Sequence, residues 1–90
     1  MFEFEWDEAK RVSNIEKHGI DFKRARELFD GRPMFISMLL RGGEIRFSSV
    51  GVVEEEIQTV IWTVRGPKVR IISARKARNA ERRQYRQLQG

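Results

Sequence analysis

The sequence contains no cysteine and only one histidine, His18, so it has few of the residues that common catalytic centres use. Without cysteine there is neither a thiolate nor a disulfide, and one histidine cannot complete a zinc site of three or four ligands. The longest apolar runs fall far short of the ~18 residues of a membrane span, and residues 1–10 lack the basic and apolar segments of a signal peptide. We therefore expect a cytoplasmic protein that works without a metal, a cofactor or a membrane.

Acidic residues are scarce in the last third of the chain. Residues 62–90 hold nine Lys or Arg and one carboxylate, Glu81, whereas residues 1–61 hold nine basic and twelve acidic residues. Clustered positive charge of this kind favours an anionic partner, which is either a nucleic acid or an acidic protein segment. Arginine outnumbers lysine thirteen to five, and this favours planar, bidentate contacts with phosphate.

The length of 90 residues indicates one domain, residues 1–90, with a single modest core. Alternating apolar and acidic residues at 2–6 predict a short strand. Asp7 is suited to cap the start of a helix over 8–18, and Gly19 is suited to the left-handed position after its end. Asp21 begins the pattern of a second helix, over about 22–29.

Four apolar segments, 34–40, 44–53, 57–64 and 68–74, predict strands, and a last helix is expected from Asn79, its predicted cap, to about Leu88. The predicted fold class is α+β, in the order β-α-α-β-β-β-β-α. We expect an antiparallel sheet with the helices packed against one of its faces.

Gly66 and Pro67 predict a two-residue hairpin turn between the last two strands. The predicted cross-strand pairs are Arg65 with Lys68, Val64 with Val69, Thr63 with Arg70, and Trp62 with Ile71. Alternation then places on one apolar face Val60, Trp62, Val64, Val69 and Ile71. On the other face it gathers Thr63, Arg65, Lys68 and Arg70, a cluster that requires either open solvent or an anionic ligand.

The C-terminal segment adds further cations to this cluster. On a helical wheel of about 100° per residue, one arc of about 160° holds Arg75, Lys76, Arg78, Arg82, Arg83 and Arg86. A solvated helix face and a grip on phosphate both remain open for this arc.

Three further residues have both a functional and a purely structural interpretation. His18 is a candidate for proton transfer, because histidine is the side chain that most often exchanges protons near neutral pH, but in the last turn of a helix it also suits the helix dipole. Lys17 beside it is a candidate phosphate contact or a solvated helix residue. The ring of Tyr85 is expected either to stack on a base or to pack beside Leu88.

Several segments resemble BrnT-like toxins. Residues 5–30, "EWDEAKRVSNIEKHGIDFKRARELFD", are similar to the start of that family, which has a Trp-Asp-x-x-Lys stretch, an Asn, Lys-His-Gly and a Phe-led second helix. The later signatures are "RFSSVG", "VIWTVRG", "VRIISARKA" and "ERRQY". Residues 31–44 carry no such match.

The resemblance implies a RelE-like fold and the toxin of a type II toxin–antitoxin pair. It implies a ribonuclease that cleaves RNA without a metal, uses the 2′-OH as nucleophile and halts translation. A BrnA-like antitoxin is the implied partner, and operator DNA is contacted only through that antitoxin. A dimer or a heterotetramer with the antitoxin is compatible with this expectation.

Metal-free phosphodiester cleavage requires proton transfer and cations that stabilise the charged phosphorane. The predicted catalytic residues are Arg65, Arg70 and Arg75 for the phosphate, with Lys17 and His18 for proton transfer. The predicted RNA-binding residues are Lys68, Lys76, Arg78, Arg82, Arg83 and Tyr85. Many family members have Glu or Trp where this chain has Val64, so the general base is unassigned. A non-catalytic nucleic-acid-binding module and a protein-interaction domain remain the alternatives.

Overall fold

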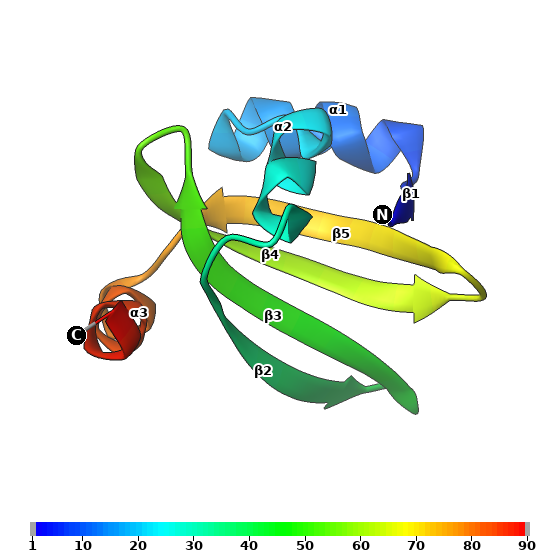
Figure 1. Ribbon diagram of the computed structural model, residues 1–90. Helices are drawn as coiled ribbons and strands as arrows, with labels where there is room; N and C mark the ends of the chain where they lie inside the picture. The colour runs from blue at the N-terminus through cyan, green and yellow to red at the C-terminus, as the bar shows by residue number, and fades with distance from the viewer. Residues whose placement is uncertain (1, 90) are drawn as a thin grey trace.

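Residues 2–89, which the computed structural model describes, form a five-stranded mixed sheet with helical segments on both faces (Figure 1). The strands lie in the order β1-β5-β4-β3-β2, with the bounds Glu3–Glu5 (β1), Met34–Arg41 (β2), Glu44–Val53 (β3), Glu56–Arg65 (β4) and Lys68–Lys76 (β5). The helical segments are α1 (Glu8–His18), α2 (Phe22–Ala25), the 3-10 segment η1 (Arg26–Phe29) and α3 (Asn79–Gln89). The α+β class is as expected. Among residues 2–89, no helix is both long and apolar enough to cross a membrane.

The expectation of a purely antiparallel sheet is wrong at one edge. Strand β1 runs parallel to β5, while the other neighbouring strands are antiparallel. Hairpin turns impose antiparallel pairing on β2 to β5. Strand β1 is joined to its neighbour by no turn, and it adds to the outer edge of the last hairpin.

The caps predicted for the N-terminal helices are confirmed. Asp7 Oδ1 accepts a hydrogen bond from the backbone N–H of Lys10, and Gly19 has the left-handed φ of 70° after the end of α1. Asp21 accepts from the N–H of Lys23. The second predicted helix is wrong in one respect, because the α-helix ends at Ala25 and the rest of 22–29 tightens into a 3-10 turn. Such turns commonly finish short helices.

Helices α1, α2 and η1 pack on one face of the sheet and enclose the larger core. Its largest fully buried side chains include Phe22 and Leu28 from the helices and Val60 and Ile71 from the strands. Gly51 of β3 faces this layer, and a Cβ there would clash with the side chain of Leu28. The close approach of η1 to the sheet therefore requires glycine at this position.

The predicted hairpin register is confirmed in all four pairs. A bulge beside Ile72 then shifts the pairing by one residue, so that Ser73 lies opposite Ile61. On the helix side Val60 and Ile71 are buried as predicted, but Val64 is 55% exposed. It lies near the hairpin end, which extends beyond the helices (Figure 1).

Helix α3 packs on the opposite face, so the prediction that all helices share one face is wrong. Tyr85 of α3 joins Val50 and Ala77 in a second, smaller core there. The predicted cap is also wrong, because Asn79 is already helical and the backbone N–H of Arg78 donates to Glu81 Oε1 at 2.7 Å. Glu81 thus supplies half of a capping box at the start of α3.

Candidate nucleic-acid interface

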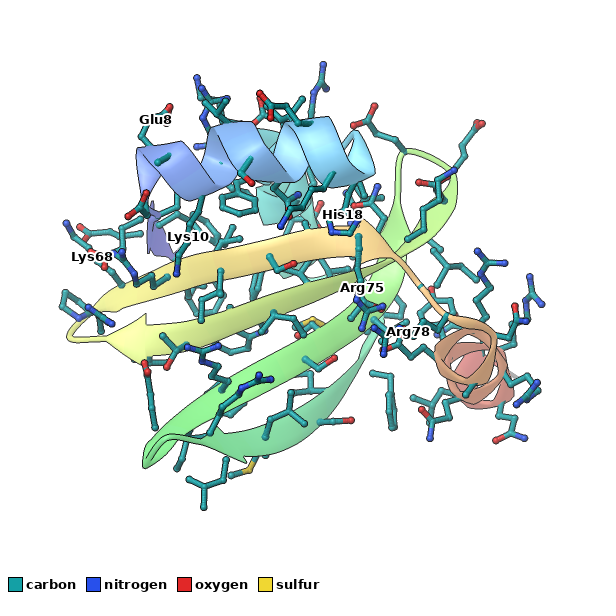
Figure 2. All side chains as sticks on the ribbon, turned by 180° about the vertical axis from the view of Figure 1, so that it is seen from behind. Glu8, Lys10, His18, Lys68, Arg75 and Arg78 are labelled. Atoms are coloured by element: carbon teal, nitrogen blue, oxygen red, sulfur yellow. The ribbon has the colours of Figure 1, made fainter. Side chains whose placement is uncertain are left out.

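The sheet face opposite α1 and α2 carries a series of cations, and we call it the basic face. Alternation along the strands places on it Arg46 of β3, Arg65 of β4, and Lys68, Arg70 and Arg75 of β5. The prediction that Arg65, Lys68 and Arg70 share a face is consistent with the register. Arg75 joins them because the bulge beside Ile72 reverses the alternation before it. Figure 2 shows Arg75 and Lys68 at opposite ends of β5.

Arg75 is held by an acidic residue of α3. Its Nη1 lies 2.8 Å from Glu81 Oε1, and its Nη2 lies 3.1 Å from Glu81 Oε2. Glu81 Oε1 also accepts from the hydroxyl of Thr59 at 3.0 Å and from the backbone N–H of Arg78. Four hydrogen bonds therefore converge on one carboxylate, and they fix the Arg75 guanidinium relative to both the sheet and α3.

These contacts determine the protonation state of Glu81. Partial burial opposes ionisation, but the hydrogen bonds from Arg75, the Arg78 backbone and Thr59 outweigh it and lower the pKa of Glu81 to about 2. The carboxylate is therefore ionised and saturated with donors at neutral pH. Such a group positions its neighbours but is a poor proton acceptor.

A hollow of about 250 Å³ lies between α3 and the basic face. Its rim, from the end of β5, the link to α3 and α3 itself, consists of Arg75, Arg78, Glu81 and Gln84. Its floor from the sheet consists of Phe35, Ser37, Leu39, Ser48, Val50 and Ile61. Figure 2 shows Arg75 and Arg78 close to each other beside the start of α3. Cations, hydroxyl groups and an apolar floor suit a ligand that carries both a phosphate and a planar base.

The other predicted cations of β4 and β5 have carboxylate partners of different quality. Arg70 Nη1 lies 2.8 Å from Glu5 Oε2, and the hydrogen bond from Arg70 lowers the pKa of Glu5. Arg65 reaches Glu44 only at 4.0 Å, and both side chains are exposed. Arg65 is thus available to a ligand, whereas Arg70 must share its charge with β1.

Sequence reasoning missed Arg46 and Glu81. Arg46 lies opposite Leu39 on the basic face, and its buried Nε has no hydrogen-bond acceptor among residues 2–89. Alternation along residues 44–53 would have placed it on the same face as Ser48. Glu81 was noted only as the one acid of a basic segment, although its position three residues after Arg78 is that of the acid in a capping box.

The remaining predicted residues lie apart from the pocket. Lys17 and His18 line a separate hollow of about 170 Å³ between α1 and β5. Lys76 does not share a helical arc with Arg75, because both residues are in β5 and alternate faces. Its Nζ lies 3.6 Å from Glu56 Oε2. The predicted proton-transfer residues therefore line a different hollow from Arg75.

The residues of α3 that were predicted to contact RNA differ in how exposed their side chains are. Arg83 and Arg86 are exposed, and Arg82 is half-buried. Tyr85 is 8% exposed and packs on Val50 and Ala77, so its ring is not presented to a base in this structure. This agrees with the alternative interpretation of Tyr85 as a packing residue, with Val50 and Ala77 as its buried neighbours.

One buried residue anchors the strand that carries Arg75. The amide nitrogen of Asn14 donates to the carbonyl oxygens of Ile20 and Ala74, and its Oδ1 accepts from the Ala74 N–H at 3.2 Å. Asn14 thereby replaces the missing neighbour strand at the outer edge of β5.

Among residues 2–89 no group of three or more His, Cys, Asp or Glu is placed to hold a metal ion.

Comparison with known proteins assigns the chain to a family. Residues 6–81 match the family model described as the ribonuclease toxin, BrnT, of type II toxin–antitoxin systems. A search of curated proteins gives no match to the chain.

Proposed function

This chain belongs to the BrnT family of ribonuclease toxins of type II toxin–antitoxin systems, and on that premise we propose that it is an endoribonuclease acting at the pocket between α3 and the basic face. The observation that carries the proposal is the fixed guanidinium of Arg75, which lines this pocket together with Arg78. We propose residues 1–90 as a single, RelE-like catalytic domain.

The proposed reaction is metal-free. The substrate 2′-oxygen attacks the neighbouring phosphorus, the bond to the 5′-oxygen breaks, and a 2′,3′-cyclic phosphate and a 5′-hydroxyl are formed. Arg75 and Arg78 stabilise the negative charge of the phosphorane, and the guanidinium of Arg75 is held in place before the charge develops. Arg65, Arg70 and Lys68 extend the cationic track and bind the flanking phosphates.

Proton transfer in this mechanism does not use Glu81. The ionisable side chains that line the pocket are Arg75, Arg78 and Glu81, and the pKa of Glu81 is about 2. Water in the pocket therefore takes the proton of the 2′-OH and returns one to the 5′-oxygen. The rate enhancement then comes mainly from charge stabilisation and orientation.

The cellular role follows from this activity. Cleavage of cytoplasmic RNA by the free chain inhibits translation, and a BrnA-like antitoxin neutralises the chain by binding it. The type II family supports a protein antitoxin as the partner. Operator DNA is reached through the antitoxin.

The test is cleavage of labelled RNA by the purified chain in the presence of EDTA. We expect products with 2′,3′-cyclic phosphate ends, and we expect Arg75→Ala to lower the rate by roughly 100-fold. Arg24→Ala is the matched control, because Arg24 is an exposed arginine on the helix side and should leave the rate unchanged. RNA binding without scission by the wild-type chain would instead identify a non-catalytic binding module.

A further inference from the structure

The helix-side face of the sheet is only half covered by helices. Helices α1 and α2 and η1 lie over β5 and the adjoining ends of β4 and β3, while the hairpin of β2 and β3 projects away from them (Figure 1). On the uncovered half lie five exposed large apolar side chains, Ile36, Met38, Leu40, Ile45 and Val64. We call this set the β2–β3 patch.

Strand pairing shows that the patch is continuous. Leu40 lies opposite Ile45, and Met38 lies opposite Phe47, whose ring stacks on Trp62 at 4.5 Å between centroids. Ile45, Phe47 and Val64 line a shallow hollow of about 470 Å³. Met38 is 66% exposed and Leu40 is 78% exposed. Exposed fractions this high are unusual for large apolar side chains that lie together, since 34% of the residues are charged and could have occupied the surface instead.

Strand β2 is also an unprotected sheet edge. It has eight residues and no proline, and its only charged residue is Arg41 at the end. Natural edge strands are usually protected by lysine, proline, a bulge or a covering segment. Backbone donors and acceptors along the outer side of β2 are thus available to a segment of another chain.

The area of the patch decides between two kinds of occupant. These five side chains are 47–78% exposed and present roughly 400 Å² of apolar surface, which is the size of the largest apolar patch on a typical monomer, and such patches are often functional. A stable interface buries ~800 Å² per partner, so two copies meeting through this patch alone reach only about half of that area. A partner that binds stably must therefore also contact surface outside the patch.

The surface on the other side of the β2 edge indicates what chemistry the rest of the partner must have. Leu39 of β2 lies beside Arg46 on the basic face, and the Arg75 pocket follows. A second copy of this chain, with a net charge of +5, would bring cations onto cations. A segment with an apolar stretch for the patch and acidic residues for the basic face is complementary to both surfaces.

We propose that the β2–β3 patch is the primary docking surface of the antitoxin, whose apolar segment packs there before an acidic continuation crosses the β2 edge onto the basic face. This inference rests on the antitoxin partner of the proposed function. The patch lies on the opposite face of the sheet from the pocket that Arg75 and Arg78 line. Binding of the antitoxin is therefore separable from RNA cleavage by substitutions in the patch.

The experiment uses the double variant Met38→Glu, Leu40→Glu, expressed with and without the protein encoded beside this chain in its operon. Both side chains are largely exposed, so the fold tolerates the change. Val12→Glu is the matched control, because Val12 is a 45% exposed apolar residue on α1. We expect the double variant to remain toxic when the antitoxin is co-expressed, whereas wild type and Val12→Glu are neutralised. Its Kd for purified antitoxin should rise by ~100-fold or more.

Three results would overturn the proposal. The first is normal neutralisation and an unchanged Kd of the double variant. The second is a wild-type dimer that becomes a monomer in the double variant by light scattering, which identifies a self-association surface. The third is a failure of the neighbouring protein to bind wild type, which removes the antitoxin partner.

If the double variant does not fold, Leu40→Glu alone at the more exposed position provides the same comparison. A wild-type chain that binds the antitoxin but does not cleave RNA refutes the proposed function and leaves this docking surface intact.

Discussion

Arg75 and Glu81 form a two-point ion pair, with distances of 2.8 Å and 3.1 Å between their nitrogen and oxygen atoms. The pair joins the end of β5 to the first turn of α3, and both side chains are about four-fifths buried. A bidentate pair of this kind fixes the plane of the guanidinium as well as its position. Arg75 can therefore present its remaining donors to the pocket in one orientation.

Replacing Glu81 by Gln should reduce RNA cleavage through Arg75. Glutamine keeps the size but removes the charge and can accept from fewer donors, so the guanidinium loses its fixed orientation. We expect kcat to fall by about tenfold with little change in KM, since orientation matters most in the transition state. Steady-state cleavage assays give both constants. Glu3→Gln, at an exposed acid of the same protein, should change neither, and an equal loss in that control would refute the specific role of Glu81.

Glu81 should also make the stability of the fold depend on acid pH. Its pKa is lowered from 4.5 to about 2 in the folded chain, so the ionised form is favoured by folding. The corresponding stability is fully present above about pH 4.5 and is lost as the pH falls toward 2. Urea unfolding from pH 6 to pH 2 should show the free energy of unfolding declining more steeply in wild type than in Glu81→Gln. Parallel curves for the two proteins would contradict the assigned pKa.

Local sequence patterns predicted most of the caps and turns that local chemistry controls, with the cap of α3 as the exception. The caps at Asp7, Gly19 and Asp21 each depend on residues a few positions apart, and the Gly66-Pro67 turn sets the hairpin register by itself. These features were correct. The turn between β3 and β4 carries no such signal, because Glu54 and Glu55 both take the positive φ that glycine and asparagine usually supply there.

The site was less predictable because it depends on contacts between distant segments. The bulge beside Ile72 brings Arg75 onto the basic face, and nothing in the local pattern indicates it. The position of α3 on the face opposite α1 is decided by the small core around Tyr85. The clustering of charge along the chain still predicted Arg75 and the cations of the hairpin as one group, whereas Lys76 was placed on the wrong face and Arg46 was missed.

Arg46 should contribute to RNA binding. Its side chain lies on the basic face, and no carboxylate among the described residues forms an ion pair with it, so its positive charge is available to a phosphate. We expect Arg46→Ala to weaken RNA binding about tenfold and to reduce the slope of log K against log salt by about one contact. Fluorescence anisotropy over a salt series measures both quantities.

The control for this measurement is Arg26→Ala. Arg26 is an exposed arginine on the helix side whose Nε donates only to the Lys23 carbonyl. Its removal changes the net charge equally but should leave the salt dependence almost unaltered. If both variants lower affinity to the same extent, the effect of Arg46 is one of overall charge and not of a specific phosphate contact.

Asn14 should be one of the most destabilising positions to truncate. Its amide makes three hydrogen bonds to the backbone of Ile20 and Ala74 and is buried. Asn14→Ala leaves those backbone groups without partners, and we expect a loss of about 2–3 kcal/mol in the free energy of unfolding. Ser13→Ala, at the neighbouring half-buried position, should cost less than ~0.5 kcal/mol. Because Ala74 directly precedes Arg75, Asn14→Ala should also slow RNA cleavage under conditions where the variant is still folded. Full activity of the folded variant would show that the edge of β5 holds Arg75 in place without Asn14.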